Sequence, residues 1–167
     1  MAKKYVPKKD YTINKRIDHI DRIRTAYIMC EDLPIATISE EYSSLSGEFD
    51  WVIKPIWENW DKLTKRGVLV SIAGIDETLH KDEYIRRYVP YFVTQRTIPE
   101  GRRDLFPMLE KIGLTYNDLF EVLCRTHGVC GNDCNYVSRT PDIIIDPRKP
   151  YKYDIPDWDT SKDGWLK

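Results

Sequence analysis

Residues 84–132 read YIRRYVPYFVTQRTIPEGRRDLFPMLEKIGLTYNDLFEVLCRTHGVCGN, and the order of breaks along this stretch decides the expected fold. A helix-like segment over 81–92 is interrupted by Pro90, because proline lacks the backbone donor that a helix interior needs. Pro-Glu-Gly at 99–101 is a second break. Apolar residues at spacings of three and four then predict a helix over 101–112.

A third helix is expected over 115–124. Gly113 stands where the end of the preceding helix favours a positive φ. The series from Thr115 to Asp118 is an imperfect capping box, which marks the start of a helix. The stretch therefore predicts three short helices with tight connections.

The residues upstream have the alternation that is typical of strands. Two short strands are expected at 27–30 and 35–38, joined by a turn at 31–34, and a third at 49–53. The run 68–72, which is apolar except for Ser71 and rich in β-branched residues, predicts a central strand.

Three further elements are expected outside these regions. Ile13, Ile17, Ile20 and Ile23 are spaced as on one face of an amphipathic helix over 13–23. A short helix is expected at 56–63 and an edge strand at 142–146. Together the elements predict an α+β fold, with an antiparallel or mixed sheet of about four to five strands and three to four short helices.

Composition indicates a soluble, cytoplasmic protein. The 167 residues have a formal net charge of −1, are 41% hydrophobic and 32% charged, and fit one globular domain. Without a basic excess, direct nucleic-acid binding is not expected. The longest apolar run is too short to span a bilayer, and no secretory signal is recognised. The four cysteines are expected to be reduced.

The domain organisation follows from the same composition. Residues 1–12 are expected to be a flexible basic arm. Residues 13–146 form the predicted domain, and 147–167 an extended tail rich in proline, aromatic and acidic residues that lies against the body or a partner.

The order of these elements resembles the N-terminal subdomain of HipA-type toxin kinases. The resemblance covers 26–136: a strand pair at 26–38, an aromatic series at 49–57, the apolar run 68–72, and the Pro-Glu-Gly and Gly-Leu breaks within 84–132. Lys54 departs from the family, which has an acid there, and the kinase half is absent.

The resemblance implies a non-enzymatic, protein-binding module of bacterial or phage origin. It would act like the stand-alone HipS-like antitoxins, which bind and inhibit a HipA- or HipT-type Ser/Thr kinase, and a HipB-like DNA-binding protein would be a further partner. Aromatic anchors often dominate such interfaces. The expected contact residues are Trp57, Trp60, Trp51, Arg96, Glu100 and Arg102. Alternatively, the three tryptophans pack in the core, and the arginines form a solvated face balanced by acids.

The residues Cys124, His127, Cys130 and Cys134 form a second candidate site. Four such ligands can satisfy the tetrahedral coordination of zinc, although ordinary semi-buried thiols are the expectation. The alternative function is a small zinc-stabilised nucleic-acid-binding or regulatory protein that uses this cluster. A third hypothesis is a cysteine nucleophile paired with His127.

Overall fold

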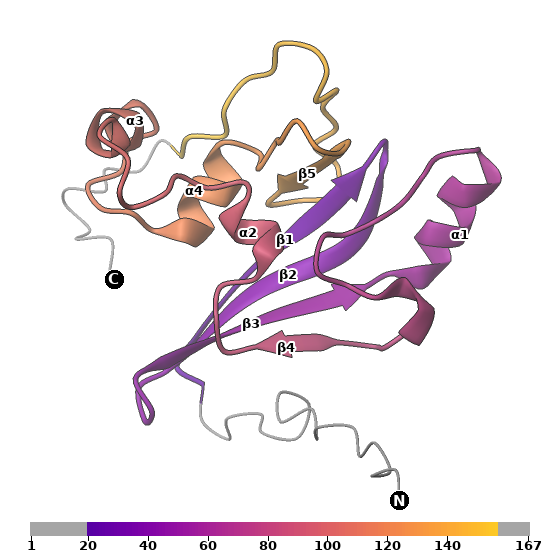
Figure 1. Ribbon diagram of the computed structural model, residues 1–167, viewed down its shortest axis with the longest axis horizontal. Helices are drawn as coiled ribbons and strands as arrows, with labels where there is room; N and C mark the ends of the chain where they lie inside the picture. The colour runs from indigo at the N-terminus through magenta and orange to yellow at the C-terminus, as the bar shows by residue number, and fades with distance from the viewer. Residues whose placement is uncertain (1–19, 157–167) are drawn as a thin grey trace, which may run out of the picture.

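The computed structural model describes residues 20–156, which form one α+β domain (Figure 1). Its antiparallel sheet has the order β4-β3-β2-β1-β5. The strands are β1 (Arg22–Cys30), β2 (Leu33–Ser43), β3 (Glu48–Pro55), β4 (Tyr84–Arg86) and β5 (Asn135–Ser138). The α-helices are α1 (Trp57–Lys65), α2 (Tyr91–Thr94), α3 (Leu105–Lys111) and α4 (Leu119–Arg125). The predicted fold class is confirmed.

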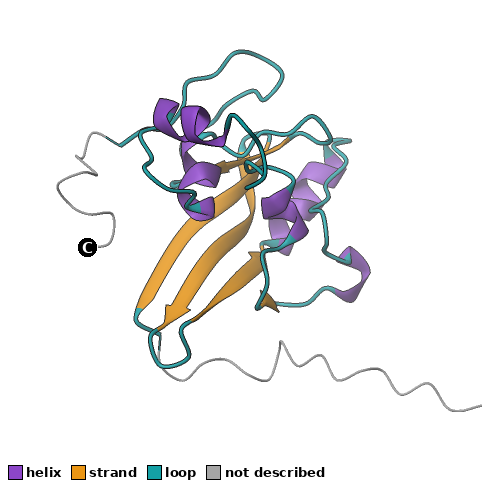
Figure 2. Ribbon diagram, turned by 60° about the vertical axis from the view of Figure 1, so that its left-hand side comes forward, coloured by secondary structure: helices purple, strands orange, loops and turns teal. Residues whose placement is uncertain are grey.

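The helices cover one face of the sheet, called here the helix face. Ala26, Ile38 and Ile53 lie opposite one another on β1, β2 and β3, and their side chains belong to the main buried cluster. Residues of α1, α2 and α4 join that cluster, so these helices pack on the same side (Figure 2). Successive side chains of a strand point to opposite faces, so Glu41 and Val52 lie on the other side, called here the back face.

Several predicted elements are confirmed with changed bounds. The three upstream strands are parts of β1, β2 and β3, and the predicted helix at 56–63 is α1. The helices expected over 101–112 and 115–124 are the shorter α3 and α4. Asp118, rather than Thr115, begins α4, because its carboxylate accepts a hydrogen bond from the Glu121 amide at 3.3 Å.

Two predictions in the middle of the chain are wrong. Residues 68–72 form no strand: Val70 and Ile72 pack into the main cluster, while Leu69 is 92% exposed. The helix predicted over 81–92 is also absent. Its first part is β4, which pairs with β3, and Pro90 is the N-cap of α2. Strand pairing and the fixed φ of proline thus outweigh local helix propensity.

The ends of the described chain add further corrections. Residues 142–146 form no strand, and the fifth strand is β5, which follows the cysteine turn and pairs with β1. Ile23 lies in β1 and is exposed, so the helix predicted over 13–23 is wrong at its end; its part before Ile20, and the arm 1–12, lie outside the described residues. In the described part of the tail, the Asp154 amide donates to the Arg125 carbonyl at 2.9 Å. Residues after 156 are not described.

Candidate functional site

A groove of about 440 Å³ opens beside β3 and the segment that precedes α4. We call it the aromatic groove. Its apolar and aromatic lining comprises Phe49, Trp51, Tyr88, Val89, Tyr116 and Leu119. Its charged lining comprises Arg22, Arg24, Arg87, Glu40, Glu48 and Asp118, so cations and anions balance. Such a groove suits an amphipathic ligand better than a strongly charged one.

Tyr88 links this groove to a smaller hollow. That second hollow, of about 90 Å³, is lined in part by Tyr88, Pro90 and Tyr91. Tyr88 and Tyr91 are both well exposed, and they flank the proline that begins α2. Tyr88 therefore borders both hollows, and Tyr91 borders the smaller one.

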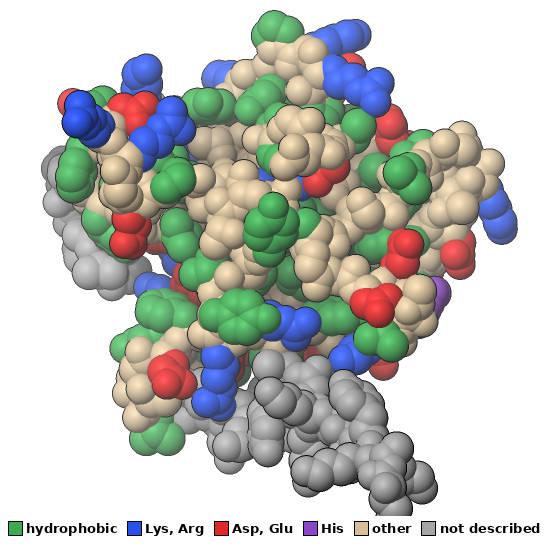
Figure 3. All heavy atoms as spheres, in the orientation of Figure 1, with side chains coloured by type: hydrophobic (Ala, Val, Ile, Leu, Met, Phe, Trp, Pro, Cys, Tyr) green, Lys and Arg blue, Asp and Glu red, His purple; other side chains and the backbone are tan. Residues whose placement is uncertain are grey.

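Figure 3 shows the surface on this side of the molecule. In the middle of this view, near the place of α2 in Figure 1, hydrophobic side chains are exposed, and charged side chains lie beside them where β4 runs. Exposed apolar patches of this kind commonly mark interaction sites.

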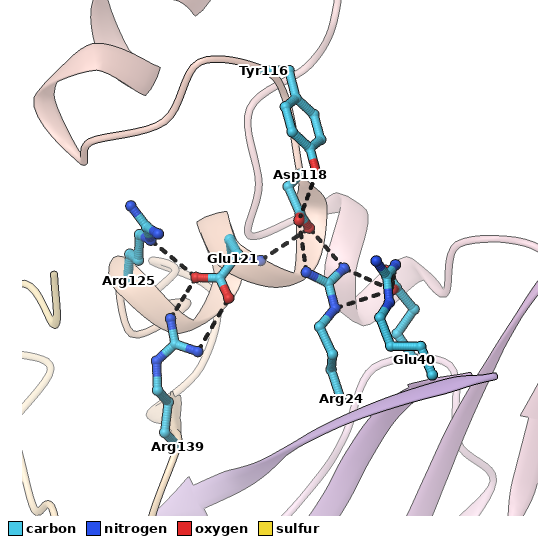
Figure 4. Close-up of polar contacts among 8 residues, drawn as sticks. Arg24, Glu40, Tyr116, Asp118, Glu121, Arg125 and Arg139 are labelled. Atoms are coloured by element: carbon cyan, nitrogen blue, oxygen red, sulfur yellow. Dashed lines mark hydrogen bonds and ion pairs between the residues drawn. The ribbon is translucent and has the colours of Figure 1, made fainter. Parts of the chain in front are cut away.

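The groove floor is a network centred on Arg24 of β1 (Figure 4). Arg24 Nη1 and Nη2 donate to the Asp118 carboxylate at 2.6 and 2.9 Å, and Nη2 also donates to Glu40 Oε1 at 2.6 Å. The guanidinium lies 4.9 Å from the Phe120 ring centroid, within cation–π distance. One arginine thus joins β1, β2 and the start of α4.

Burial and charge shift the titration of groups in this network. Burial alone lowers the pKa of Arg24, but the hydrogen bonds and charges of Asp118 and Glu40 raise it above its ordinary value. Burial, together with the Asp118 charge, raises the pKa of Tyr116 to about 12. Arg24 therefore stays charged near neutral pH, and Tyr116 remains a neutral hydroxyl.

A second network lies behind the groove, at Glu121 of α4 (Figure 4). Glu121 Oε2 accepts from Arg125 Nε at 3.0 Å and from Arg139 Nη2 at 2.6 Å. Arg125 Nη1 also donates to the Ile112 carbonyl at 2.7 Å, at the end of α3. Arg139 reaches Asp154 of the tail at 3.5 Å. This network holds α3, α4 and the tail together.

The structure separates the three tryptophans proposed as partner contacts. Trp51 and Trp60 are buried in the main cluster, and Trp60 Nε1 donates to the Ile35 carbonyl at 2.8 Å. Trp57 is half-buried; it stacks on His80 with ring centroids 4.4 Å apart and donates to the Lys81 carbonyl. Of the three tryptophans, Trp57 has ring surface that a partner could reach, and it does not line the aromatic groove. Trp51 is buried and lines the groove.

The three charged candidates also differ from one another. The side chain of Arg96 is buried, donates to the Gly128 carbonyl at 2.8 Å, pairs with Asp133, and lies 4.1 Å from the Phe92 ring centroid. It holds the turn after α4 in place. Glu100 and Arg102 are exposed, and Arg102 pairs with Asp104 at 2.8 Å.

The cysteine and histidine candidates point in different directions. Cys124 is buried in α4, and burial raises the pKa of its thiol to about 12. Buried His127 directs Nδ1 to the Val137 carbonyl at 2.8 Å. Cys130 Sγ accepts from Gln95, and Cys134 Sγ accepts from Arg148. Within residues 20–156, no three His, Cys, Asp or Glu side chains are grouped closely enough to hold a metal ion.

Sequence reasoning missed the aromatic groove. Its signal was the alternation of Arg22 and Arg24, which places both side chains on one face of a strand. The isoleucine spacing over 13–23 favoured a helix and concealed that alternation. The helix predicted over 81–92 includes Tyr88, although the following Val89-Pro90 pair favours extended backbone.

This chain was compared with known proteins at three levels. No protein-family model, no curated protein and no solved structure matches this chain. The resemblance to HipA-type N-terminal subdomains therefore depends on the motif residues alone. Among residues 20–156, no helix is both long and apolar enough to cross a membrane.

Proposed function

We propose that this chain is a non-enzymatic binding module that docks on a HipA-like Ser/Thr kinase and inhibits it, as a HipS-like antitoxin does. A kinase is proposed as the partner because the order of motifs between 26 and 136 resembles HipA-type N-terminal subdomains. The aromatic groove with its exposed tyrosines is the observation that carries the proposal of binding.

The groove has the character of a protein-binding surface. Tyrosine offers a large apolar ring with a polar tip and is enriched at interfaces. Tyr88 is 64% exposed and borders both hollows, so its ring is the central accessible anchor. The paired charges of the floor are held inside the domain, and a partner can cover them without breaking an ion pair. An apolar or aromatic side chain of the kinase would occupy the groove.

Trp57 is a second candidate contact. Its half-buried ring lies beside His80 and Lys81, on the loop between α1 and β4. Trp51 and Trp60 act through the fold, because both are buried. Inhibition would then follow when the docked module blocks the kinase cleft or prevents its closure, since lid and domain motions gate kinase turnover.

Co-purification with a HipA-like kinase from the same cell, followed by titration of the kinase activity, tests the proposal. We expect a one-to-one complex and loss of phosphoryl transfer. Tyr88→Ala should weaken binding by at least about tenfold, as for a central aromatic anchor. Phe106→Ala is the matched control: Phe106 is 71% exposed on α3 and does not line the groove, so its loss should leave affinity unchanged.

The outcomes separate the parts of the proposal. Absence of any complex with the kinase overturns the proposed function. A complex that Tyr88→Ala leaves intact but Trp57→Ala weakens moves the contact to the loop beside His80. Equal weakening by Phe106→Ala would show that the groove has no special role.

A further inference from the structure

A hollow of about 460 Å³ lies between α3, the turn that follows α4 and the described part of the tail. We call it the cationic hollow, because its described lining includes Arg96, Arg102 and Lys111 and no Asp or Glu. Three other large hollows, of about 440, 520 and 630 Å³, have both acids and cations in their described linings. Since the whole chain has a formal net charge of −1, this lining is a local excess of cations, which favours an anionic ligand.

Two of these cations can reach a ligand. Lys111 is exposed in the last turn of α3, and it forms no ion pair within residues 20–156. Arg102 is also exposed, and its Nε lies 2.8 Å from Asp104 Oδ1. An exposed pair of this kind contributes little in water, so an anion can compete for the guanidinium. Arginine and lysine are both common phosphate-binding side chains.

The third cation fixes one wall of the hollow. The Arg96 side chain is buried; its Nη1 donates to the Gly128 carbonyl at 2.8 Å, and its Nη2 pairs with Asp133. Beside it, Gln95 Nε2 donates to Cys130 Sγ at 3.3 Å. The turn after α4 is therefore held before any ligand binds, and a preformed wall lowers the entropic cost of binding.

The tail supplies an aromatic wall. Tyr151 and Tyr153 line the hollow with their ring centroids 5.9 Å apart, and Tyr153 is 43% exposed. The Asp154 amide donates to the Arg125 carbonyl, which holds this part of the tail beside α4 (Figure 1). Aromatic side chains stack well on flat rings such as nucleobases.

We infer that the cationic hollow binds a small aromatic phosphate, of which a nucleoside monophosphate is the simplest example. Lys111 and Arg102 provide the charge that attracts the phosphate, and Tyr151 and Tyr153 provide the surface for the ring. The volume of about 460 Å³ lies within the range of small-molecule sites, roughly 300–1,000 Å³. This inference is independent of the proposed kinase docking, which uses the aromatic groove.

Titration calorimetry of the full chain with adenosine 5′-monophosphate tests the inference. Adenosine and inorganic phosphate, each alone, probe the two halves of the ligand, and both should bind at least about tenfold more weakly. Lys111→Ala should weaken nucleotide binding about tenfold, because it removes a charge-assisted contact. Lys65→Ala is the matched control: Lys65 is also exposed in the last turn of its helix, α1, and does not line the hollow, so affinity should not change.

A second pair of variants tests the arginine. Arg102→Ala should weaken nucleotide binding about tenfold for the same reason. Its neighbour Arg103 is exposed and does not line the hollow, so Arg103→Ala should leave affinity unchanged.

Alkylation of the native chain locates the site without a substitution. Cys130 and Cys134 are both partly exposed, but Cys130 lines the cationic hollow and Cys134 lines a different one. With the nucleotide at about ten times its Kd, mass action should slow iodoacetamide labelling of Cys130 about tenfold, as read by mass spectrometry. Labelling of Cys134 should not change.

Any of the following results would overturn the inference. The nucleotide could fail to bind at about 1 mM, a concentration that reveals even weak ligands. Inorganic phosphate or adenosine could bind as tightly as the nucleotide, which would remove the role of the ring or of the cations. Lys65→Ala or Arg103→Ala could weaken binding as much as Lys111→Ala, which would indicate non-specific charge attraction. Equal protection of Cys134 would place the ligand outside the hollow.

Discussion

The guanidinium of Arg24 and the carboxylate of Asp118 lie 2.6 Å apart, although 94 positions separate them in the chain. The same carboxylate accepts a hydrogen bond from the Glu121 amide at the start of α4. One residue therefore both begins a helix and attaches it to the sheet. Tyr116, two positions before Asp118, lines the aromatic groove together with Phe49 and Trp51 of β3.

Removal of the Arg24 guanidinium should destabilise the fold. In Arg24→Ala, the carboxylates of Glu40 and Asp118 lose a shared counter-charge while they remain buried. We expect the free energy of unfolding, measured in urea, to fall by about 3 kcal/mol. The control is Arg66→Ala, which breaks an exposed ion pair with Asp32 and should cost less than about 1 kcal/mol. Equal losses in the two variants would contradict a central role for Arg24.

Stability should fall in acid through Glu121. Burial raises the pKa of this carboxyl, but hydrogen bonds and charges from Arg139 and Arg125 lower it below its ordinary value. Its contribution is therefore present above the unfolded-state pKa of about 4.3, and is lost as the pH falls through the lower folded-state pKa. Urea unfolding between about pH 7 and about pH 3 measures this loss of stability. In Glu121→Gln the free energy of unfolding should fall less steeply as the pH decreases. If it falls as steeply as in the native chain, the acid sensitivity belongs to other carboxyls.

Gly128 occupies a position that excludes a side chain. Its φ is +51°, and a Cβ there would lie 2.9 Å from Leu123 Cδ1 and 3.1 Å from Val137 Cγ2. Gly128→Ala should lower the free energy of unfolding by about 2–4 kcal/mol, from backbone strain and overpacking. Gly67→Ala is the control, because Gly67 also has a positive φ but nothing within 4 Å of its Cβ position, so only the strain of about 1 kcal/mol remains. A similar loss in both variants would exclude steric crowding.

The two tryptophans of α1 should differ in their effect on stability. Trp60 is buried and donates to the Ile35 carbonyl, so Trp60→Ala should cost about 3–5 kcal/mol. Trp57 is half-buried, and Trp57→Ala should cost about half as much. Chemical denaturation of both variants measures this difference. A larger loss for Trp57 would mean that its stack on His80, rather than the core, fixes α1.

The sequence correctly predicted those strands and helices in which the spacing of apolar side chains reflects burial of one face. Alternation in β1 to β3 and the three-and-four spacing in α3 are set by which face is buried, and both are readable from the chain alone. The prediction of a strand at 68–72 was wrong because β-branched and apolar residues suit any buried extended segment, whether or not it pairs with another strand. β4 was missed because its three residues are too few to show a period.

The amino-acid sequence alone determined the α+β class, the first three strands and the helices after Pro-Glu-Gly, because side-chain periodicity and proline restrict the backbone locally. Only the tertiary structure decided that Leu69 is exposed, that β5 pairs with β1, and that Arg24 reaches Asp118. The physical reason is that strand pairing and buried ion pairs are selected among distant partners by the free energy of the whole fold. No local pattern records that selection.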